Sequence, residues 1–493
     1  MLRAAILRLS KHTLAYSTAE YLSRIAGFLL IPLYTGYLTE ADYGTRELFA
    51  ITVAVLVQLA GINVTTAMHR AYFENEDADR RRRVVSTTLW AVAAVASVFV
   101  LVGLATSDWI VPHVPSQHPG LANLWRLTLG IFLFQMLREV QNKYLQAEER
   151  STLYGALAVT KLVFEISLQV WFLVGLDWGL EGLFLGVLIS EGLFCTILAM
   201  ITLPRVGFAF SGPIFAGLAA FTLPLIPNGV FQFCLHSADR FMLGWLTDGT
   251  EAVGLYALAY KMGYMANALI LGPFLMIWYP FLFSTEEDQR AELCGRLTPY
   301  FMMIMTFVLF VLALFAQDVI ELMAGRPGYY KAWKAVPVIG LGYWFWGLFQ
   351  MLQTGFFIRK LTSQLPWISG AAVLVNLFTN LMLIPLYGFM GAAWATLLTF
   401  AVLAVITRYK AQSLYPVEIQ WSKVFGPLVL ALALGCAGLL STQLPSPWPW
   451  AAKISCLVLW LLGIWLLFVS TDERLEVRRA IAGLRSRNSK GDE

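Results

Sequence analysis

The chain has 493 residues, of which 58% are hydrophobic and only 13% charged, and its formal net charge is +4. Soluble domains carry roughly a quarter charged residues, so this composition, with a mean hydropathy of +0.66, excludes a protein that exposes most of its surface to water. The basic residues form small clusters between apolar runs, which argues against a nucleic-acid-binding domain. We therefore predict an all-α polytopic membrane protein.

The first 13 residues are basic and amphipathic, and they predict a cytoplasmic surface helix that leads into the first span. A helix needs about 20 apolar residues to cross the hydrocarbon core. We expect fourteen such spans, while twelve would require two apolar runs that do not cross. In chain order they lie near 14–38, 46–68, 84–106, 121–145, 152–176, 180–203, 213–246, 253–283, 297–318, 335–358, 366–387, 389–412, 423–443 and 450–470.

Lysines and arginines between the spans indicate the orientation, because cytoplasmic loops carry an excess of them. With the N-terminus inside, 24 of the 35 basic residues fall in cytoplasmic segments and five in outer segments. This split predicts that both termini are cytoplasmic, as an even number of helices requires. The segment DADRRRR at 77–83 is explained by the same rule, although contact with an anionic lipid or a carrier phosphate is an alternative.

Three sequence echoes predict an internal duplication with an offset of about 209 residues. The segment near 35–51 resembles that near 243–261, FQML occurs at 134–137 and 349–352, and Gly179/Gly182 are echoed by Gly388/Gly391. Each copy holds six helices, so the copies are parallel repeats about an axis along the membrane normal. The expected parts are the N-terminal helix 1–13, lobes at 14–209 and 210–420, two further helices at 421–472, and a basic cytoplasmic tail at 473–493.

Ionisable residues within the spans are candidates for function, because lipid does not solvate them. Several recur at helical spacing and so share one helix face. The candidates for binding an anionic substrate are Arg24, Arg46, Arg138, Lys161, Arg240 and Lys261, with Tyr260 and Tyr264 as aromatic partners. The candidates for ion coupling are Glu20, Glu139, Glu165 and Asp239.

Simpler roles remain open for these residues. Glu20–Arg24 and Lys161–Glu165, each at i, i+4, could be ion pairs that only lock helices together. Arg138 and Glu139 could reach the cytoplasmic interface, and Asp239–Arg240 could lie at the outer one. Tyr343, Trp344 and Trp346 are explained equally well as interfacial anchors or as sugar-stacking residues.

The two halves differ in charge when they are aligned through FQML. Arg138 and Glu139 correspond to the neutral Gln353 and Thr354 of the second copy, and Asn142 to Phe357. An anionic head group is therefore expected to bind closer to the first half. Arginine suits a pyrophosphate because its guanidinium binds phosphate in a bidentate manner.

Motifs for catalysis, nucleotide binding and metal binding do not occur in the sequence. It contains no Walker motif, its five histidines lack ligand spacing, and its five cysteines form no CxxC pair. We expect no metal and no cofactor apart from a coupling ion, H⁺ or Na⁺. The five cysteines are expected to pack as small apolar residues.

Two stretches resemble a known family. SRIAGFLLIPLYTGYLTEADYGTRELFAI and ADRFMLGWLTDGTEAVGLYALAYKMG are similar to segments of the polysaccharide transporters, the Wzx-type oligosaccharide flippases of the multidrug/oligosaccharidyl-lipid/polysaccharide flippase superfamily. The resemblance implies a V-shaped, two-lobed fold of twelve to fourteen helices with a cationic cavity. It also implies that Arg24, Arg46 and Lys261, on helices 1, 2 and 8, supply the cavity cations.

The resemblance implies transport of an undecaprenyl-pyrophosphate-linked oligosaccharide across the bacterial inner membrane, by alternating access and with an ion gradient. Membrane lipids, glycosyltransferases and a polysaccharide polymerase are the expected partners. A MATE-like multidrug/cation antiporter is the main alternative, but its cavity should be net acidic. A polymerase or ligase is a third hypothesis, which the short outer loops disfavour.

Overall fold

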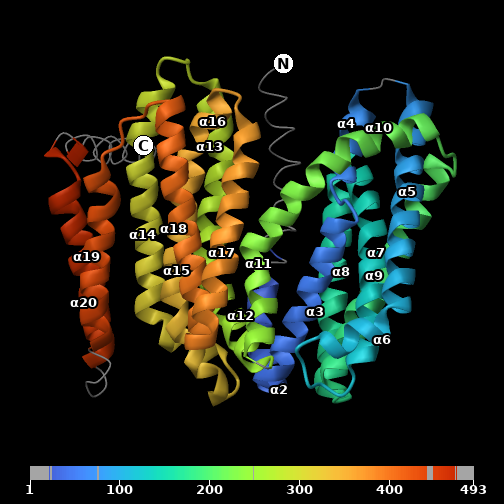
Figure 1. Ribbon diagram of the computed structural model, residues 1–493, viewed down its shortest axis with the longest axis horizontal. Helices are drawn as coiled ribbons and strands as arrows, with labels where there is room; N and C mark the ends of the chain where they lie inside the picture. Colours follow the sequence, from blue (N-terminus) through green and yellow to red (C-terminus); the bar gives the residue numbers. More distant parts are fainter. Residues whose placement is uncertain are drawn as a thin grey trace, which may run out of the picture. The chain divides into compact units, whose positions relative to one another are not determined.

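The computed structural model describes residues 22, 25–74, 77–247, 249–440, 448–471, 473 and 474, and within these ranges it contains helices, turns and loops but no strand (Figure 1). The predicted all-α fold class is confirmed. Ten of the described helices are long and apolar enough to cross a membrane, or up to twelve if each of two bent pairs is one span. The number fourteen stays a prediction, and the predicted N-terminal helix at 1–13 lies outside the described residues.

The chain divides into two compact units, and each is described by itself. The first consists of Met1–Leu258, Ile320–Ala332 and Ser369–Ala395, and the second of Ala259–Val319, Trp333–Ile368 and Thr396–Glu493. The lobe boundary expected at residue 210 stays a prediction.

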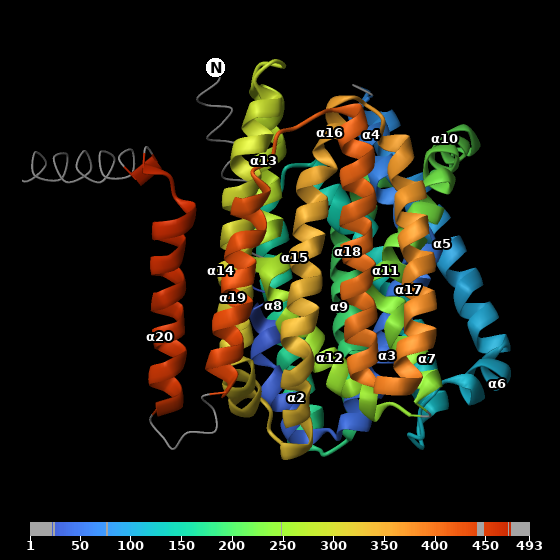
Figure 2. The same cartoon turned by 60° about the vertical axis from the view of Figure 1, so that its left-hand side comes forward.

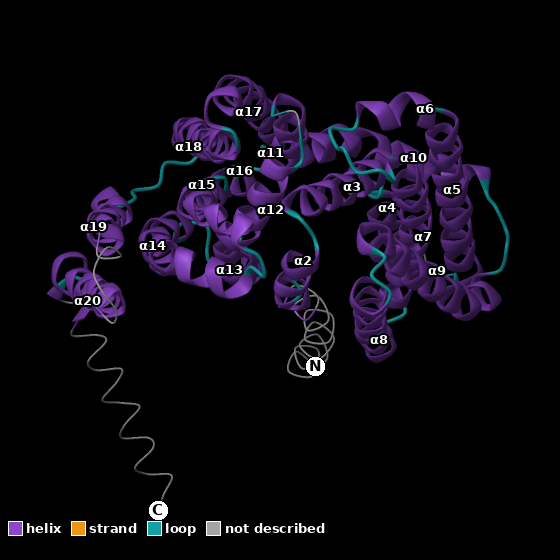
Figure 3. Ribbon diagram, turned by 90° about the horizontal axis from the view of Figure 1, so that it is seen from below, coloured by secondary structure: helices purple, strands orange, loops and turns teal. Residues whose placement is uncertain are grey.

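The first unit contains most of the helices from the N-terminal half of the chain. They are α2 (Ile31–Tyr37), α3 (Glu40–Leu59), α4 (Val64–Phe73), α5 (Ala78–Ala105), α6 (Ser107–Ile110), α7 (Leu121–Ala147), α8 (Ser151–Val170), α9 (Gly179–Val206), α10 (Gly212–Thr222) and α11 (Ile226–Leu246). Short 3-10 or π turns follow α6, α8 and α10 at Val111–His113, Trp171–Gly175 and Leu223–Leu225. Within this unit α7 packs against α9 and α5, as the end-on view in Figure 3 shows.

The second unit contains α13 (Gly272–Ser284), α15 (Val336–Leu352), α16 (Thr354–Ile358), α19 (Trp421–Leu440) and α20 (Trp448–Gly463). Four further helices contribute residues to both units, and they are α12 (Glu251–Gly263), α14 (Arg290–Met323), α17 (Leu365–Tyr387) and α18 (Phe389–Leu414). The remaining turns are Asn267–Leu271, Pro327–Ala335, Thr362–Gln364 and Ile464–Phe468.

The two stretches that carry the family resemblance pack against each other in the first unit. Thr39 caps α3 in a capping box, because its hydroxyl accepts from the Asp42 amide at 3.1 Å while Asp42 accepts from the Thr39 amide. Gly44 faces the start of α12 so closely that a Cβ there would lie 1.9 Å from the Thr250 carbonyl oxygen. Gly44, in the first of the two stretches, is therefore needed for close helix packing.

Two predicted spans are bent. Between α3 and α4 the axis turns by 44° at Gly61, whose φ of +80° suits glycine. The amides of Gly61 and Ile62 bond to the carbonyls of Gln58 and Val57, which is the Schellman pattern that ends helices. The span expected at 213–246 bends by 47° where Pro224 and Pro227 remove backbone donors.

The second unit is held together by aromatic and apolar packing. Phe310 and Leu314 of α14 form a buried cluster with Ala431 of α19 and with Cys456 and Trp460 of α20. Figure 2 shows α19 and α20 side by side. At one end of this group the Lys453 ammonium of α20 donates to the Asp318 carboxylate of α14. The two helices that follow the predicted repeats are thus packed on α14.

Candidate functional site

The candidate site begins where three helices of the first unit bring their ionisable side chains together. Arg138 of α7 binds Glu191 of α9 with two contacts, from Nε to Oε2 at 2.6 Å and from Nη2 to Oε1 at 3.3 Å. Lys161 of α8 places its ammonium 3.1 Å from Glu191 Oε1 and 2.5 Å from Glu165 Oε2. Two predicted cations therefore share a buried carboxylate.

Hydrogen bonds extend this cluster along α8 to α2 and α3. The Gln169 amide donates to Glu165 Oε1 at 3.3 Å, and its oxygen accepts from the Tyr34 hydroxyl. The Arg46 guanidinium lies over the Tyr34 ring, 4.6 Å from its centroid, within the range of a cation–π contact. The stripe Lys161–Glu165–Gln169 thus connects two groups of cations.

The series of ionic contacts continues from α3 to α11 and α12. Glu47 lies between two arginines, 3.9 Å from Arg46 Nη1 and 3.4 Å from Arg240 Nε. Arg240 Nη1 also lies 3.5 Å from Asp239 Oδ1, and Asp239 Oδ2 accepts from the Tyr256 hydroxyl at 2.5 Å. We call the eleven connected residues the ionic network: Arg138, Glu191, Lys161, Glu165, Gln169, Tyr34, Arg46, Glu47, Arg240, Asp239 and Tyr256.

The ionic network contains as many acids as bases. Arg46, Arg138, Lys161 and Arg240 face Glu47, Glu165, Glu191 and Asp239, so its formal charge is zero. Each charge has an opposite charge within 4 Å, which offsets the desolvation that burial costs. A phosphate that binds these cations therefore competes with the carboxylates already paired with them.

The predicted aromatic residues of the second unit contact one another. Tyr260 and Tyr343 join their hydroxyls, and Tyr264 lies edge-on to Tyr343 with ring centroids 5.0 Å apart. Trp344 donates to the Thr306 hydroxyl at 2.8 Å, and both Tyr343 and Trp344 are fully buried. Packing inside the unit therefore accounts for Tyr343 and Trp344, while Tyr264 and Lys261 are half-buried.

Several expected site residues do not join the ionic network in the part of the chain that the structure describes. Glu139 is half-buried beside Arg138 on α7. Glu20 and Arg24 lie outside the described residues, so their predicted pairing stays a prediction. Among the described residues, no three His, Cys, Asp or Glu side chains could hold a metal ion.

The sequence interpretation missed Glu191 and Glu47. Glu191 is a single carboxylate in the middle of the apolar α9, and only 5% of its surface is exposed. The general expectation that an ionisable residue within a span is functional was signal enough to find it. Glu47 directly follows Arg46, and its contact with Arg240 depends on tertiary packing.

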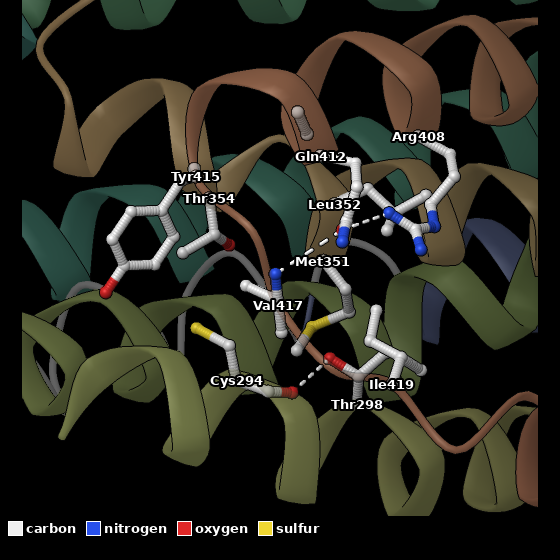
Figure 4. Close-up of a pocket in the computed structure, with 12 residues that line it drawn as sticks. Cys294, Thr298, Met351, Leu352, Thr354, Arg408, Gln412, Tyr415, Val417 and Ile419 are labelled. Atoms are coloured by element: carbon white, nitrogen blue, oxygen red, sulfur yellow. Dashed lines mark hydrogen bonds between the residues drawn. The ribbon is translucent and has the colours of Figure 1, made fainter.

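The second unit has a small pocket of about 20 Å³ between α14, α15, α16, α18 and the segment after α18 (Figure 4). There Gln412 accepts from Arg408 and from the Val417 amide, and Thr298 donates to the Cys294 carbonyl. Space of this size holds about one water molecule. The pocket is too small for a sugar.

Solved structures place the fold among membrane transporters. The chain is similar to the lipid II flippase MurJ in an inward closed conformation, with a TM-score of 0.73, 13% identity, and coverage of 91% of this chain and 98% of that one. It is also similar to an inward-facing MATE family multidrug resistance transporter of the MOP superfamily, with a TM-score of 0.60, 16% identity and coverage of 83% and 97%. These identities establish the fold alone.

A third similar structure is a MOP superfamily transporter from Pyrococcus furiosus, with a TM-score of 0.54, 13% identity, and coverage of 83% of this chain and 95% of that one. A search of curated proteins finds no matching relative. The protein is thus a multi-pass membrane protein with a transporter fold. A family model described as "Polysaccharide biosynthesis protein" matches residues 35–332, more than half of the chain, and the chain belongs to this family.

Proposed function

We propose that this protein is a flippase that moves an undecaprenyl-pyrophosphate-linked oligosaccharide from the inner to the outer leaflet of the bacterial inner membrane. The transported unit would be a repeat of an O-antigen or an exopolysaccharide. The observation that carries the proposal is the ionic network, which holds four cations inside a membrane unit of a polysaccharide biosynthesis family member. Arginines and a lysine in a partly dry site suit a pyrophosphate.

The remaining predicted residues receive roles within this proposal. Lys261 would add a cation from the second unit, and Tyr260 and Tyr264 would contact sugars. Proton or sodium coupling is assigned to Glu20, Glu139, Glu165 and Asp239, of which Asp239 is 1% exposed and held by Arg240 and Tyr256. Transport would proceed by alternating access, with both termini in the cytoplasm and with glycosyltransferases and a polymerase as pathway partners.

A MATE-like cation antiporter is the second candidate, because the fold is shared with MATE transporters. A site for cationic drugs needs an excess of carboxylates, since a cation inside the membrane requires an opposite charge. The ionic network has no such excess. The balance of four bases and four acids therefore disfavours a cationic substrate.

Reconstituted vesicles provide the test. Undecaprenyl-pyrophosphate oligosaccharide is placed in proteoliposomes, and its arrival in the outer leaflet is followed with an external glycosidase, with ethidium efflux as the antiporter assay. We expect wild-type protein to expose the oligosaccharide and Arg138→Gln to reduce the rate at least tenfold. Arg126→Gln is the matched control, because Arg126 lies exposed on the same helix.

Ethidium transport without oligosaccharide transport would overturn the proposal in favour of the antiporter. Equal rates for Arg138→Gln and Arg126→Gln would remove the ionic network from the substrate path. Arg24→Ala tests the predicted cation of helix 1 in a deletion strain, where we expect export to be lost while the protein remains in the membrane.

A further inference from the structure

The two carboxylates that surround Lys161 differ in how firmly they are held. Glu191 touches two cations and its side chain is 7% exposed, whereas Glu165 touches one cation and one amide and is 22% exposed. Arg138 adds a bidentate contact to Glu191 alone. Glu191 is therefore the fixed counter-ion of the cluster and Glu165 the more accessible one.

Removing either carboxylate has a different electrostatic consequence. Without Glu191, Lys161 keeps Glu165 at 2.5 Å, but Arg138 loses the carboxylate that it contacts twice, and a buried charge that has lost its partner is strongly unfavourable. Without Glu165, Lys161 still keeps Glu191 at 3.1 Å, and the cluster of Arg138, Lys161 and Glu191 carries a formal charge of +1. The loss of Glu165 thus turns a neutral cluster into an anion-binding one.

The geometry makes Glu165 a stand-in for a phosphate. Its Oε2 lies within hydrogen-bonding distance of the Lys161 ammonium, and a phosphate oxygen accepts the same kind of charge-assisted bond from an ammonium. Glu165 and Lys161 are on one helix at i, i+4, so a rotation of the Glu165 side chain alone would open one contact of Lys161 while its contact with Glu191 remains. Such a movement requires no change in the backbone.

We propose that Glu165 is an exchangeable counter-ion, which occupies on Lys161 the place that a phosphate of the lipid-linked substrate takes. Glu191 is a positioning residue that keeps Arg138 and Lys161 in place during the exchange. This inference rests on the proposed anionic substrate. Among the described residues, Arg138 on α7 and Gln169 on α8 contact the carboxylates of this exchange, and Gln169 in turn accepts from Tyr34 on α2.

The exchange has a consequence for transport. A carboxylate tethered at this distance competes with the substrate at an effective concentration in the millimolar range or above. It therefore weakens binding of the phosphate and speeds its release on the far side. A substrate that also gains binding energy from its lipid and sugars tolerates this competition better than free phosphate does.

Binding measurements on the full-length protein in nanodiscs test the exchange, with undecaprenyl pyrophosphate and inorganic pyrophosphate as separate probes. We expect Glu165→Gln to tighten binding of undecaprenyl pyrophosphate about tenfold, which corresponds to roughly 1.4 kcal/mol, and to slow its release. We expect Glu191→Gln to abolish binding and Glu191→Asp to restore part of it. The double variant Lys161→Gln/Glu165→Gln should show no tightening, because the cation is gone.

Glu74→Gln is the matched control, because Glu74 pairs with Arg70 at i, i+4 in the same unit but is 56% exposed. It should leave binding unchanged. Unchanged or weaker binding in Glu165→Gln, in a variant that keeps the wild-type melting temperature, would overturn the exchange even if wild-type protein transports oligosaccharide. Tighter binding in a protein that transports none would retain the exchange and overturn the proposed function. If Glu165→Gln tightened binding of inorganic pyrophosphate but not of undecaprenyl pyrophosphate, the exchange would also be overturned, because the lipid-linked substrate is then not the competing anion.

Discussion

The two FQML segments of the chain show how similar helices can serve different purposes. In the first, α7 continues through Arg138, which pairs with Glu191 of a neighbouring helix. In the second, α15 ends at Leu352, Gln353 donates to Gln350 within the same turn, and Thr354 accepts from Trp278 at 3.4 Å. The first unit uses this position for a buried charge and the second for neutral hydrogen bonds.

The difference matters because a buried ion pair and a neutral hydrogen bond respond differently to change. A charge whose partner is removed remains costly to bury, while a neutral partner loses only about 1 kcal/mol. The first unit should therefore be the more sensitive of the two at this position. The predictions below test this contrast from the largest expected effect to the smallest.

Replacing Glu191 with alanine should have the largest effect. It leaves Arg138 and Lys161 buried without their shared carboxylate, which should cost about 3–5 kcal/mol. We expect a clear fall in the apparent melting temperature of purified protein in detergent. A melting temperature equal to that of the wild type would show that the pair is solvated, and the contrast between the segments would disappear.

Placing the charge of the first unit in the second should also destabilise the protein. Gln353 is 8% exposed and hydrogen-bonded to Gln350, so Gln353→Arg puts a guanidinium where the wild-type side chains are neutral. We expect a loss of about 2–3 kcal/mol. The double variant Gln353→Arg/Gln350→Glu should recover part of the melting temperature, and no recovery would show that steric crowding causes the loss.

A neutral contact of the second unit should matter less. Thr354→Val removes the acceptor of the Trp278 indole but keeps the side-chain shape, which should cost about 1 kcal/mol. The melting temperature and the tryptophan fluorescence report this change. A loss as large as that of Glu191→Ala would contradict the idea that the neutral segment is the more tolerant one.

Much of the helical arrangement was predictable, because apolar runs of membrane-spanning length are a strong signal. The spans expected at 152–176 and 180–203 agree with the helical segments Ser151–Gly175 and Gly179–Val206. The bends were missed, although Gly61 and the pair Pro224 and Pro227 were visible signals. Hydropathy alone does not distinguish a straight apolar run from a broken one.

The candidate site was predictable only within single helices. Lys161, Glu165 and Gln169 share a face through their spacing of four, and the structure joins them by hydrogen bonds. The partnership of Arg138 with Glu191 spans 53 residues, and helical periodicity carries no information about such tertiary pairs. The predicted duplication stays a prediction. The non-glycine residues Glu149 and Lys360, 211 positions apart, have positive φ values of +55° and +59° at helix ends.

The smallest expected effect on stability concerns the partly exposed ion pair between Lys423 and Glu473 of the second unit. This pair can be compared with the buried pairs of the ionic network. Burial alone would raise the pKa of Glu473, but hydrogen bonds from Lys423, Tyr300 and Ser470 lower it to about 2. A carboxyl whose pKa is lower in the folded state contributes stability above its unfolded pKa of about 4.3, and this contribution is lost as the pH falls towards 2.

We therefore expect Lys423→Gln to lower the melting temperature slightly at pH 7, with a difference from wild type that shrinks as the pH falls from about 5 towards 2. High salt should also reduce the difference, because solvent ions screen a pair whose carboxylate side chain is 29% exposed. The Arg138–Glu191 pair should be far less sensitive to salt, since both side chains are largely buried. Melting curves of Lys423→Gln and Arg138→Gln at low and high salt measure this difference directly, and equal salt dependence would mean that water reaches the ionic network as freely as it reaches Glu473.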